Sequence, residues 1–93
     1  MRLSLPLLTL TLALASSTFA AHSAWCTVNK NGKGATNYQV TKDCCAATKE
    51  TGTTGFNEAS WECQDALGAG NGINLGRFVQ CCGSRGAGSH SDG

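Results

Sequence analysis

Apolar side chains recur along the chain with two spacings, one typical of strands and one typical of helices. Residues 24–29 are rich in Trp, Thr and Val and lead into a polar loop that contains two glycines, which predicts a strand. Residues 37–49 place apolar side chains at positions i, i+4 and i+7, which predicts a helix with one apolar face formed by Val40, Cys44 and Ala47. Thr36 or Asn37 can cap the start of this helix.

A similar set of elements follows in the second half of the chain. Residues 53–57 and 61–65 predict two strands that pair as a hairpin, and the second of them alternates apolar and polar side chains. Residues 73–83 predict the clearest helix, because its apolar positions fall on one face: Leu75, Phe78, Val79 and Cys82. Residues 84–93 are small and polar, and they predict a flexible C-terminal tail.

The six cysteines follow one spacing twice. In each half, seventeen residues separate a single cysteine from a Cys-Cys doublet: Cys26 precedes Cys44 and Cys45, and Cys63 precedes Cys81 and Cys82. When the halves are aligned on this spacing, the Gly-rich loops correspond and Tyr38 corresponds to Leu75. The pattern therefore indicates two pseudo-repeats of a strand–helix unit.

These elements predict an α+β fold, a small disulfide-stabilised sandwich with the order strand, helix, hairpin, helix. Each amphipathic helix needs a sheet to cover, and two helices on one face of a small sheet meet that need. The expected arrangement is the ferredoxin-like βαββα order. A loop-rich knot with little regular structure is the alternative.

Residues 1–20 have the features of a secretory signal peptide. Arg2 gives a positive start, residues 3–14 form an apolar segment, and the small residues up to Ala20 form a cleavage site. The apolar segment is shorter than the roughly 20 residues that cross a bilayer. We therefore expect a secreted, extracellular protein with no membrane span, in which residues 21–83 form one domain.

Removal of this leader leaves equal numbers of acidic and basic side chains. The six basic and six acidic residues are Lys30, Lys33, Lys42, Lys49, Arg77, Arg85, Asp43, Glu50, Glu58, Glu62, Asp65 and Asp92. A formally neutral surface argues against capture by nucleic acid or by anionic membranes. It also argues against the antimicrobial mode that requires a basic amphipathic helix.

An even number of cysteines in a short secreted chain predicts three disulfides rather than a metal site. Structural zinc sites use Cys-x-x-Cys pairs, which the sequence lacks, and His22 and His90 lie near the two ends of the mature chain. The preferred scheme joins each strand cysteine to a doublet and the doublets to each other, for example as Cys26–Cys44, Cys63–Cys81 and Cys45–Cys82. Six cysteines allow fifteen connectivities, and the sequence does not choose among them.

Candidate catalytic groups are few. A Ser-His-Asp set needs a firmly held histidine, and neither histidine lies in a predicted element. Glu58, Glu62 and Asp65 cluster around the strand at 61–65, with Glu62 and Asp65 on opposite faces, and a solvated charged edge is the simpler interpretation. The Gly-rich loops match no phosphate-binding fingerprint. We therefore expect no enzymatic activity and no cofactor.

The signal peptide, the short mature chain, the expected disulfides and the Cys-Cys doublets together resemble the small secreted cysteine-rich proteins of filamentous fungi. The segments GAGNGI at 68–73, FVQCC at 78–82 and GAGSH at 86–90 are similar to that group. Many of its members are candidate effectors that disturb the defence of host plants. The order of elements is also similar to the α/β killer toxins of smut fungi, at the level of the fold. Hydrophobins share the doublets, but they have eight cysteines.

The resemblance implies a secreted, non-enzymatic, effector-like virulence protein that binds a host protein or glycan and modulates defence. The alternatives are a killer-toxin-like or antimicrobial protein that acts on competing microbes, and a small hydrolase or inhibitor that uses Glu62 or Asp65. The first candidates for a binding surface lie beside the two Gly-rich loops: Lys30, Lys33, Asn71 and Asn74. A monomer is expected.

Overall fold

The computed structural model describes residues 20–92, which form two helices and two antiparallel sheets. The expected signal peptide lies outside the described residues, apart from Ala20. In chain order the elements are β1 (Ala20–Ala21), β2 (Ser23–Thr27), α2 (Tyr38–Thr48), β3 (Thr54–Asn57), β4 (Glu62–Asp65), the 3-10 turn η1 (Ala66–Gly68), β5 (Ile73–Asn74), α3 (Leu75–Ser84) and β6 (Gly88–Ser91). The strands and helices predicted from the sequence are confirmed to within two residues at either end.

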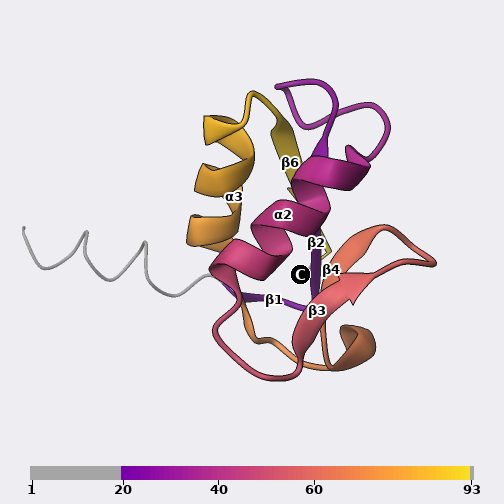
Figure 1. The fold of residues 1–93 in the computed structure, drawn as a ribbon, viewed down its shortest axis with the longest axis vertical. Coiled ribbons are helices and arrows are strands. Elements are labelled where there is room, and N and C mark those ends of the chain that lie inside the picture. Colours follow the sequence, from indigo (N-terminus) through magenta and orange to yellow (C-terminus); the bar gives the residue numbers. More distant parts are fainter. Residues whose placement is uncertain (1–19, 93) are drawn as a thin grey trace, which may run out of the picture.

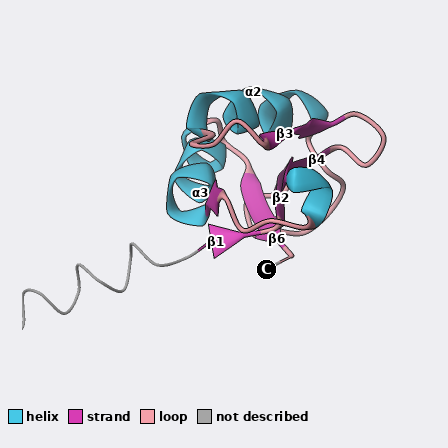
Figure 2. Cartoon of the chain, turned by 90° about the horizontal axis from the view of Figure 1, so that it is seen from below, coloured by secondary structure: helices cyan, strands magenta, loops and turns pink. Residues whose placement is uncertain are grey.

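The main sheet has the strand order β3-β4-β2-β6, with every neighbouring pair antiparallel, and β1 pairs separately with β5. Figures 1 and 2 show α2 and α3 on one face of this sheet. Helix α2 packs against β2, β3 and β4, whereas α3 packs against β2 and β6. The α+β class and the disulfide-stabilised frame are thereby confirmed. Over residues 20–92, neither helix is long and apolar enough to cross a membrane.

The two helices begin at corresponding positions of the two halves. Asn37 caps α2, its side-chain oxygen accepting from Val40 N at 3.2 Å. Asn74 caps α3 in the same way, accepting from Arg77 N at 3.1 Å. An asparagine at this position satisfies an amide that the helix itself leaves without a partner. The pseudo-repeat alignment of Tyr38 with Leu75 therefore places the start of both helices, since these are the first residues of α2 and α3.

The core lies between the helices and the sheet and is small. Alternation along β2 sends Ala24 and Cys26 toward the helices, where both are fully buried, and sends Trp25 to the opposite face. Phe78 of α3 is the largest fully buried side chain. Five of the six cysteines are 0–1% exposed, so sulfur occupies space that aliphatic side chains fill in larger domains. Three disulfides therefore supply much of what holds this domain together.

All six cysteines form disulfides, but the preferred pairing is wrong. The bonds are Cys26–Cys82, Cys44–Cys81 and Cys45–Cys63 instead of Cys26–Cys44, Cys63–Cys81 and Cys45–Cys82. The type of scheme is right, because each strand cysteine joins a doublet and the doublets join each other. The error concerns which half supplies the partner. Each strand cysteine bonds to the helix of the other half. Helix α2 packs over β4 and supplies the partner of Cys63, whereas β2 lies under both helices and Cys26 bonds to α3.

The predicted flexible tail at 84–93 is also wrong. Ser84 belongs to α3, and Gly88–Ser91 form the edge strand β6, which pairs with β2 from Ala24 to Thr27. Gly88 is buried opposite Thr27, and a Cβ atom there would meet Gly32 N and Thr27 Oγ1 at 2.6 Å. The small residues that suggest a tail are the residues that allow this close backbone approach.

Candidate interaction surface

The tip of the β3–β4 hairpin is organised by Asn57. Its side-chain oxygen accepts from Ala59 N at 2.8 Å and from Ser60 N at 3.3 Å, and its backbone oxygen accepts from Trp61 N at 2.7 Å. These bonds close the turn of the hairpin that the sequence predicts from residues 53–57 and 61–65. They also bring the chain into β4 through Trp61, which precedes the strand rather than belonging to it.

Trp61 has a left-handed backbone, with φ of 62°. This region favours glycine, and a bulky residue there costs on the order of 1–3 kcal/mol unless its surroundings hold it. The indole is 46% exposed, so burial of the side chain does not account for the choice of residue. A strained residue that displays a large aromatic side chain is typical of a functional position.

One aromatic ring contacts the indole, and a second ring packs against the first. Tyr38, the first residue of α2, lies edge-on to Trp61 with ring centroids 5.1 Å apart. The same tyrosine ring lies edge-on to Phe56 of β3 at 5.3 Å. Such edge-to-face pairs contribute about 0.5–1.5 kcal/mol each beyond the area they bury. We call Tyr38, Phe56 and Trp61, together with Lys42 and Glu58, the hairpin cluster.

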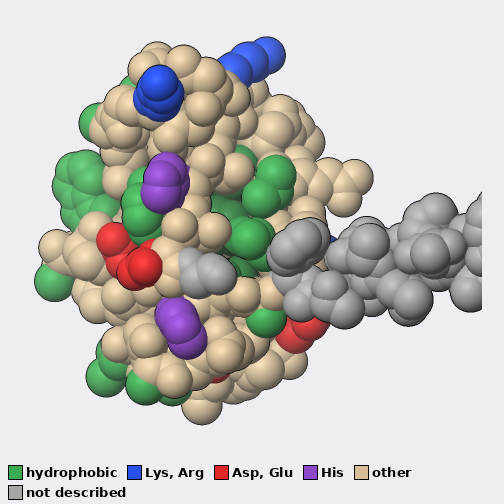
Figure 3. Space-filling view, turned by 180° about the vertical axis from the view of Figure 1, so that it is seen from behind, with side chains coloured by type: hydrophobic (Ala, Val, Ile, Leu, Met, Phe, Trp, Pro, Cys, Tyr) green, Lys and Arg blue, Asp and Glu red, His purple; other side chains and the backbone are tan. Residues whose placement is uncertain are grey.

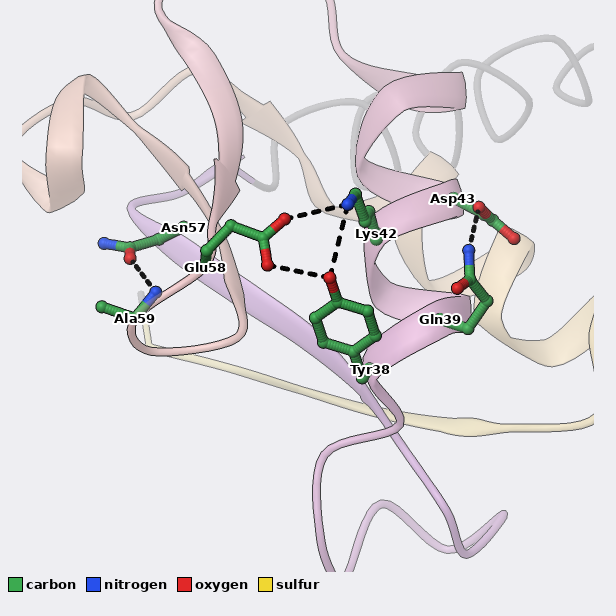
Figure 4. A network of polar contacts seen from close by, with 7 residues as sticks. All are labelled: Tyr38, Gln39, Lys42, Asp43, Asn57, Glu58 and Ala59. Carbon is green, nitrogen blue, oxygen red and sulfur yellow. Dashed lines mark hydrogen bonds and ion pairs between the residues drawn. The ribbon is translucent and has the colours of Figure 1, made fainter.

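Glu58 connects the hairpin to α2 (Figure 4). Its carboxylate accepts from Tyr38 Oη at 2.8 Å and from Lys42 Nζ at 2.9 Å, and Lys42 also donates to Tyr38 Oη at 3.3 Å. The lysine lowers the pKa of Glu58, with a smaller contribution from Tyr38, and the bond to Glu58 is the main cause that raises the pKa of Lys42. Because the three groups are exposed, their main effect is to orient the tyrosine ring beneath Trp61.

A groove runs along the other face of β3. It has a volume of about 360 Å³ and is lined by Gly52–Asn57, Gln64, Ala66 and Leu67. Asn57 donates to Gln64 Oε1 at 2.8 Å, so two side-chain amides form part of its wall. Leu67 is 87% exposed and, like Ala66, has a positive φ. Left-handed backbone with an exposed apolar side chain therefore occurs on both sides of β4, at Trp61 before the strand and at Leu67 after it.

The face of the sheet that the helices leave open is mainly uncharged. Trp25 lies on it, and the ring of His90 stacks on the indole with centroids 5.0 Å apart and 15° between the planes. Figure 3 shows this face, with histidine side chains and few charged groups spread over it. The stack holds β6 against β2 and covers part of the indole, so Trp25 offers less free aromatic surface than Trp61.

Asp65 ties the loop before β3 to the loop before β5. The carboxylate is buried and accepts hydroxyl hydrogens from Thr51, Thr53 and Thr54 on Oδ1 and the amide of Gly72 on Oδ2. The bonds from Thr53 and then Thr54 hold the pKa of Asp65 below its ordinary value. A carboxyl that stays ionised and has its oxygens occupied is a poor general acid, which argues against the hydrolase hypothesis for Asp65.

The residues predicted to flank the binding loops do not come together. Lys30 and Lys33 are exposed in the loop after β2, whereas Asn71 lies in the loop between η1 and β5. Because β2 and β4 are antiparallel neighbours, these loops leave opposite ends of the sheet (Figure 1). Asn74 caps α3 and also donates to Glu50 Oε2 at 3.1 Å, so its side chain has a structural role.

The remaining candidate groups have structural partners. His22 Nδ1 lies 2.8 Å from the carbonyl oxygen of Gly70, and Glu62 accepts from Gln64 Nε2 at 3.3 Å. The sulfurs of Cys26, Cys44 and Cys82 lie within 4.8 Å of one another, a spacing that metal ligands also show. All three sulfurs are bonded in disulfides, so they are not thiolate ligands.

Local sequence pattern does not predict the hairpin cluster as a site. The alternation at 61–65 predicts a half-buried strand that includes Trp61. The i, i+4 spacing of Tyr38 and Lys42 on one helix was the available signal, since it brings those two side chains together. The contribution of Glu58 and Trp61 depends on the hairpin lying against α2, which local pattern does not reveal.

Comparison with known proteins gives a family but no function. No curated protein and no solved structure matches the chain. One family model, described as a family of unknown function, matches residues 21–92, which cover both helices, the whole main sheet and all three disulfides. The chain therefore belongs to the family of unknown function DUF5948.

Proposed function

We propose that this protein is a secreted, effector-like binding protein, and that the hairpin cluster is the surface that contacts a host protein or glycan. The proposal rests on the exposure and the backbone of Trp61. The residue is 46% exposed, and its backbone adopts a conformation that favours glycine. Tryptophan is enriched among the residues that contribute most to binding energy at interfaces. The ring of Tyr38, itself packed against Phe56, preorganises the indole, which lowers the entropy lost on binding.

The surroundings of the cluster support a binding role rather than catalysis. The carboxylates of Glu58 and Asp65 are held by hydrogen bonds that lower their pKa values, so both favour the ionised form. The groove beside β3 offers amide groups and Leu67, which suit a polar ligand with an apolar face, such as a sugar ring or an extended peptide. Secretion and an origin in a plant-associated fungus rest on the leader sequence and on the resemblance described above.

The order β3-β4-β2-β6, with both helices on one face, also supports the ferredoxin-like arrangement that we propose for this fold. An experimental structure is the test of that assignment. A different strand order would contradict it.

The binding proposal is tested with three forms of the oxidised protein: the natural chain, Trp61→Gly and Val79→Ala. Val79 is a matched control because it is 44% exposed on α3, away from the hairpin cluster. Each form is presented with extracellular fluid from plant tissue and with purified cell-wall polysaccharides, and the affinity for each retained molecule is measured. Trp61→Gly should weaken binding about tenfold or more while Val79→Ala leaves it unchanged. Equal binding by all three forms would contradict the proposal.

The toxin alternative has its own readout. Growth of a panel of fungi and bacteria is measured with the same three proteins. No inhibition is expected, with the disulfides verified intact by mass spectrometry. Inhibition by the natural chain at micromolar concentration, without specific retention of any plant molecule, would favour a toxin that acts on competing microbes.

A further inference from the structure

One cysteine differs from the other five in its exposure to solvent. Cys26, Cys44, Cys45, Cys63 and Cys82 are 0–1% exposed, whereas Cys81 is only partly buried. Cys81 also lines a surface hollow of about 400 Å³ with Thr48, Arg77, Gln80 and Ser84. Thiol–disulfide exchange requires a thiolate to reach the sulfur it attacks. Of the three disulfides, Cys44–Cys81 is therefore the one that a small thiol can reach in the folded protein.

The buried partner of this sulfur is close to a second disulfide. Cys44 bonds to Cys81, and its sulfur lies within 4.8 Å of the sulfurs of both Cys26 and Cys82. Those two cysteines bond to each other. A thiolate released on Cys44 would thus lie beside a disulfide that no external thiol can reach. Cys45 and Cys63 do not belong to this sulfur cluster.

We propose that Cys81 is a site of reversible S-thiolation by small thiols, and that Cys44 relays the exchange to the buried Cys26–Cys82 bond. In the first step the sulfur of the external thiolate bonds to Cys81 Sγ, the Cys44–Cys81 bond breaks, and its electron pair leaves on Cys44. In the second step the Cys44 thiolate bonds to one sulfur of the Cys26–Cys82 disulfide. The other sulfur leaves as a thiolate and takes a proton from water. One external thiol is consumed, and the number of disulfide bonds, counting the mixed one, is unchanged.

The hollow imposes no evident charge requirement on the attacking thiol. Arg77 lines the hollow and carries a positive charge, but its guanidinium lies 3.3 Å from the carboxylate of Glu50 and pairs with it. The exposure of Cys81, rather than electrostatic attraction of the thiol, therefore makes this cysteine the point of attack. Local loosening at the C-terminal turn of α3, where Cys81 lies, exposes this sulfur more readily than global unfolding does.

The test uses the purified, oxidised protein and glutathione. Samples are exposed to glutathione at about pH 8, where thiolate is available, quenched with acid, alkylated and mapped by mass spectrometry. The product should carry one glutathione on Cys81, with Cys44 bonded to Cys26 or Cys82, the free thiol on the other of these two, and the Cys45–Cys63 bond intact. A free thiol that stays on Cys44 would overturn the relay. Glutathione appearing first on Cys45 or Cys63, or loss of all three disulfides together, would overturn the proposal.

A paired variant tests whether the Cys44–Cys81 bond is the point of attack. Cys44→Ala with Cys81→Ala removes the accessible bond and leaves two disulfides whose sulfurs are all buried. This double variant should lose the glutathione adduct, and adduct formation on its remaining cysteines at the natural rate would count against the proposal. The mapping on the natural chain stands by itself if the double variant does not fold.

Discussion

Thr53 Oγ1 donates to Asp65 Oδ1 at 2.6 Å, a bond that joins the loop before β3 to the end of β4. The carboxylate is buried and accepts from two more threonines and from the amide of Gly72. One aspartate therefore ties the loop before β3 to the loop before β5. Gly72 passes so close to it that a Cβ atom there would meet Asp65 Oδ1 at 2.7 Å.

Replacing Asp65 with asparagine should destabilise the fold. The amide has one acceptor oxygen where the carboxylate has two, and its NH2 group would face groups that donate. Unfolding in urea is the measurement, with Glu62→Gln on the same strand as the matched control, because Glu62 accepts a single bond, from Gln64 at 3.3 Å. A similar midpoint for the two variants would contradict this role for Asp65.

The same carboxylate predicts how stability depends on pH. The threonine bonds lower its pKa in the folded state below the unfolded value of about 3.9. The stabilisation by ionised Asp65 is therefore complete above that value and is lost as the pH falls through the folded pKa. Urea titrations at a series of acid pH values should show a shallower loss of stability for Asp65→Asn than for the natural chain. Parallel curves would exclude the effect.

Glycine and alanine at position 61 should separate backbone strain from aromatic contact. Both substitutions remove the contact with Tyr38, but only glycine relieves the left-handed backbone at φ of 62°. We expect Trp61→Gly to be more stable than Trp61→Ala by about 1 kcal/mol. The free energies of unfolding of the two variants decide this, and a more stable alanine variant would mean that residue 61 does not hold this conformation.

Two glycines near the C-terminus should respond in opposite directions to alanine. Gly88→Ala should destabilise by about 1–3 kcal/mol, since its Cβ would press on Thr27 Oγ1 and displace β6. Gly83→Ala, in α3 with open space around it, should stabilise by about 0.5–1 kcal/mol. Thermal unfolding of both variants is the measurement. Tolerance of alanine at 88 would indicate that β6 does not pair with β2.

Removal of a disulfide should lower the free energy of unfolding by an amount that depends on the length of the loop it closes. In the chain-entropy model the Cys26–Cys82 loop, with a sequence separation of 56, contributes about 4 kcal/mol. The Cys45–Cys63 loop, with a separation of 18, contributes about 3 kcal/mol. Paired alanine variants of each bond should therefore differ by about 1 kcal/mol in unfolding free energy. Peptide mapping of the natural chain provides the independent check on connectivity.

Local sequence pattern was sufficient for the helices, for three strands of the main sheet and for the participation of all six cysteines in disulfides. Apolar spacing places α2 and α3, and an asparagine cap marks where each begins. These features depend on neighbours within a few residues, so they can be predicted from the chain itself. The cysteine repeat also predicts the type of disulfide scheme, with a strand cysteine joined to each doublet.

Tertiary structure decided which half supplies each disulfide partner, because Cys26 and Cys63 bond to the helix of the other half rather than to the helix next in sequence. It also made a strand of Gly88–Ser91, whose small side chains have little strand propensity and pair only because β2 offers a free edge. The same holds for the candidate site. Asn57, at the end of β3 and the start of the turn, binds the backbone of Trp61, and Tyr38 of α2 contacts its ring. No local pattern encodes contacts among three separate elements.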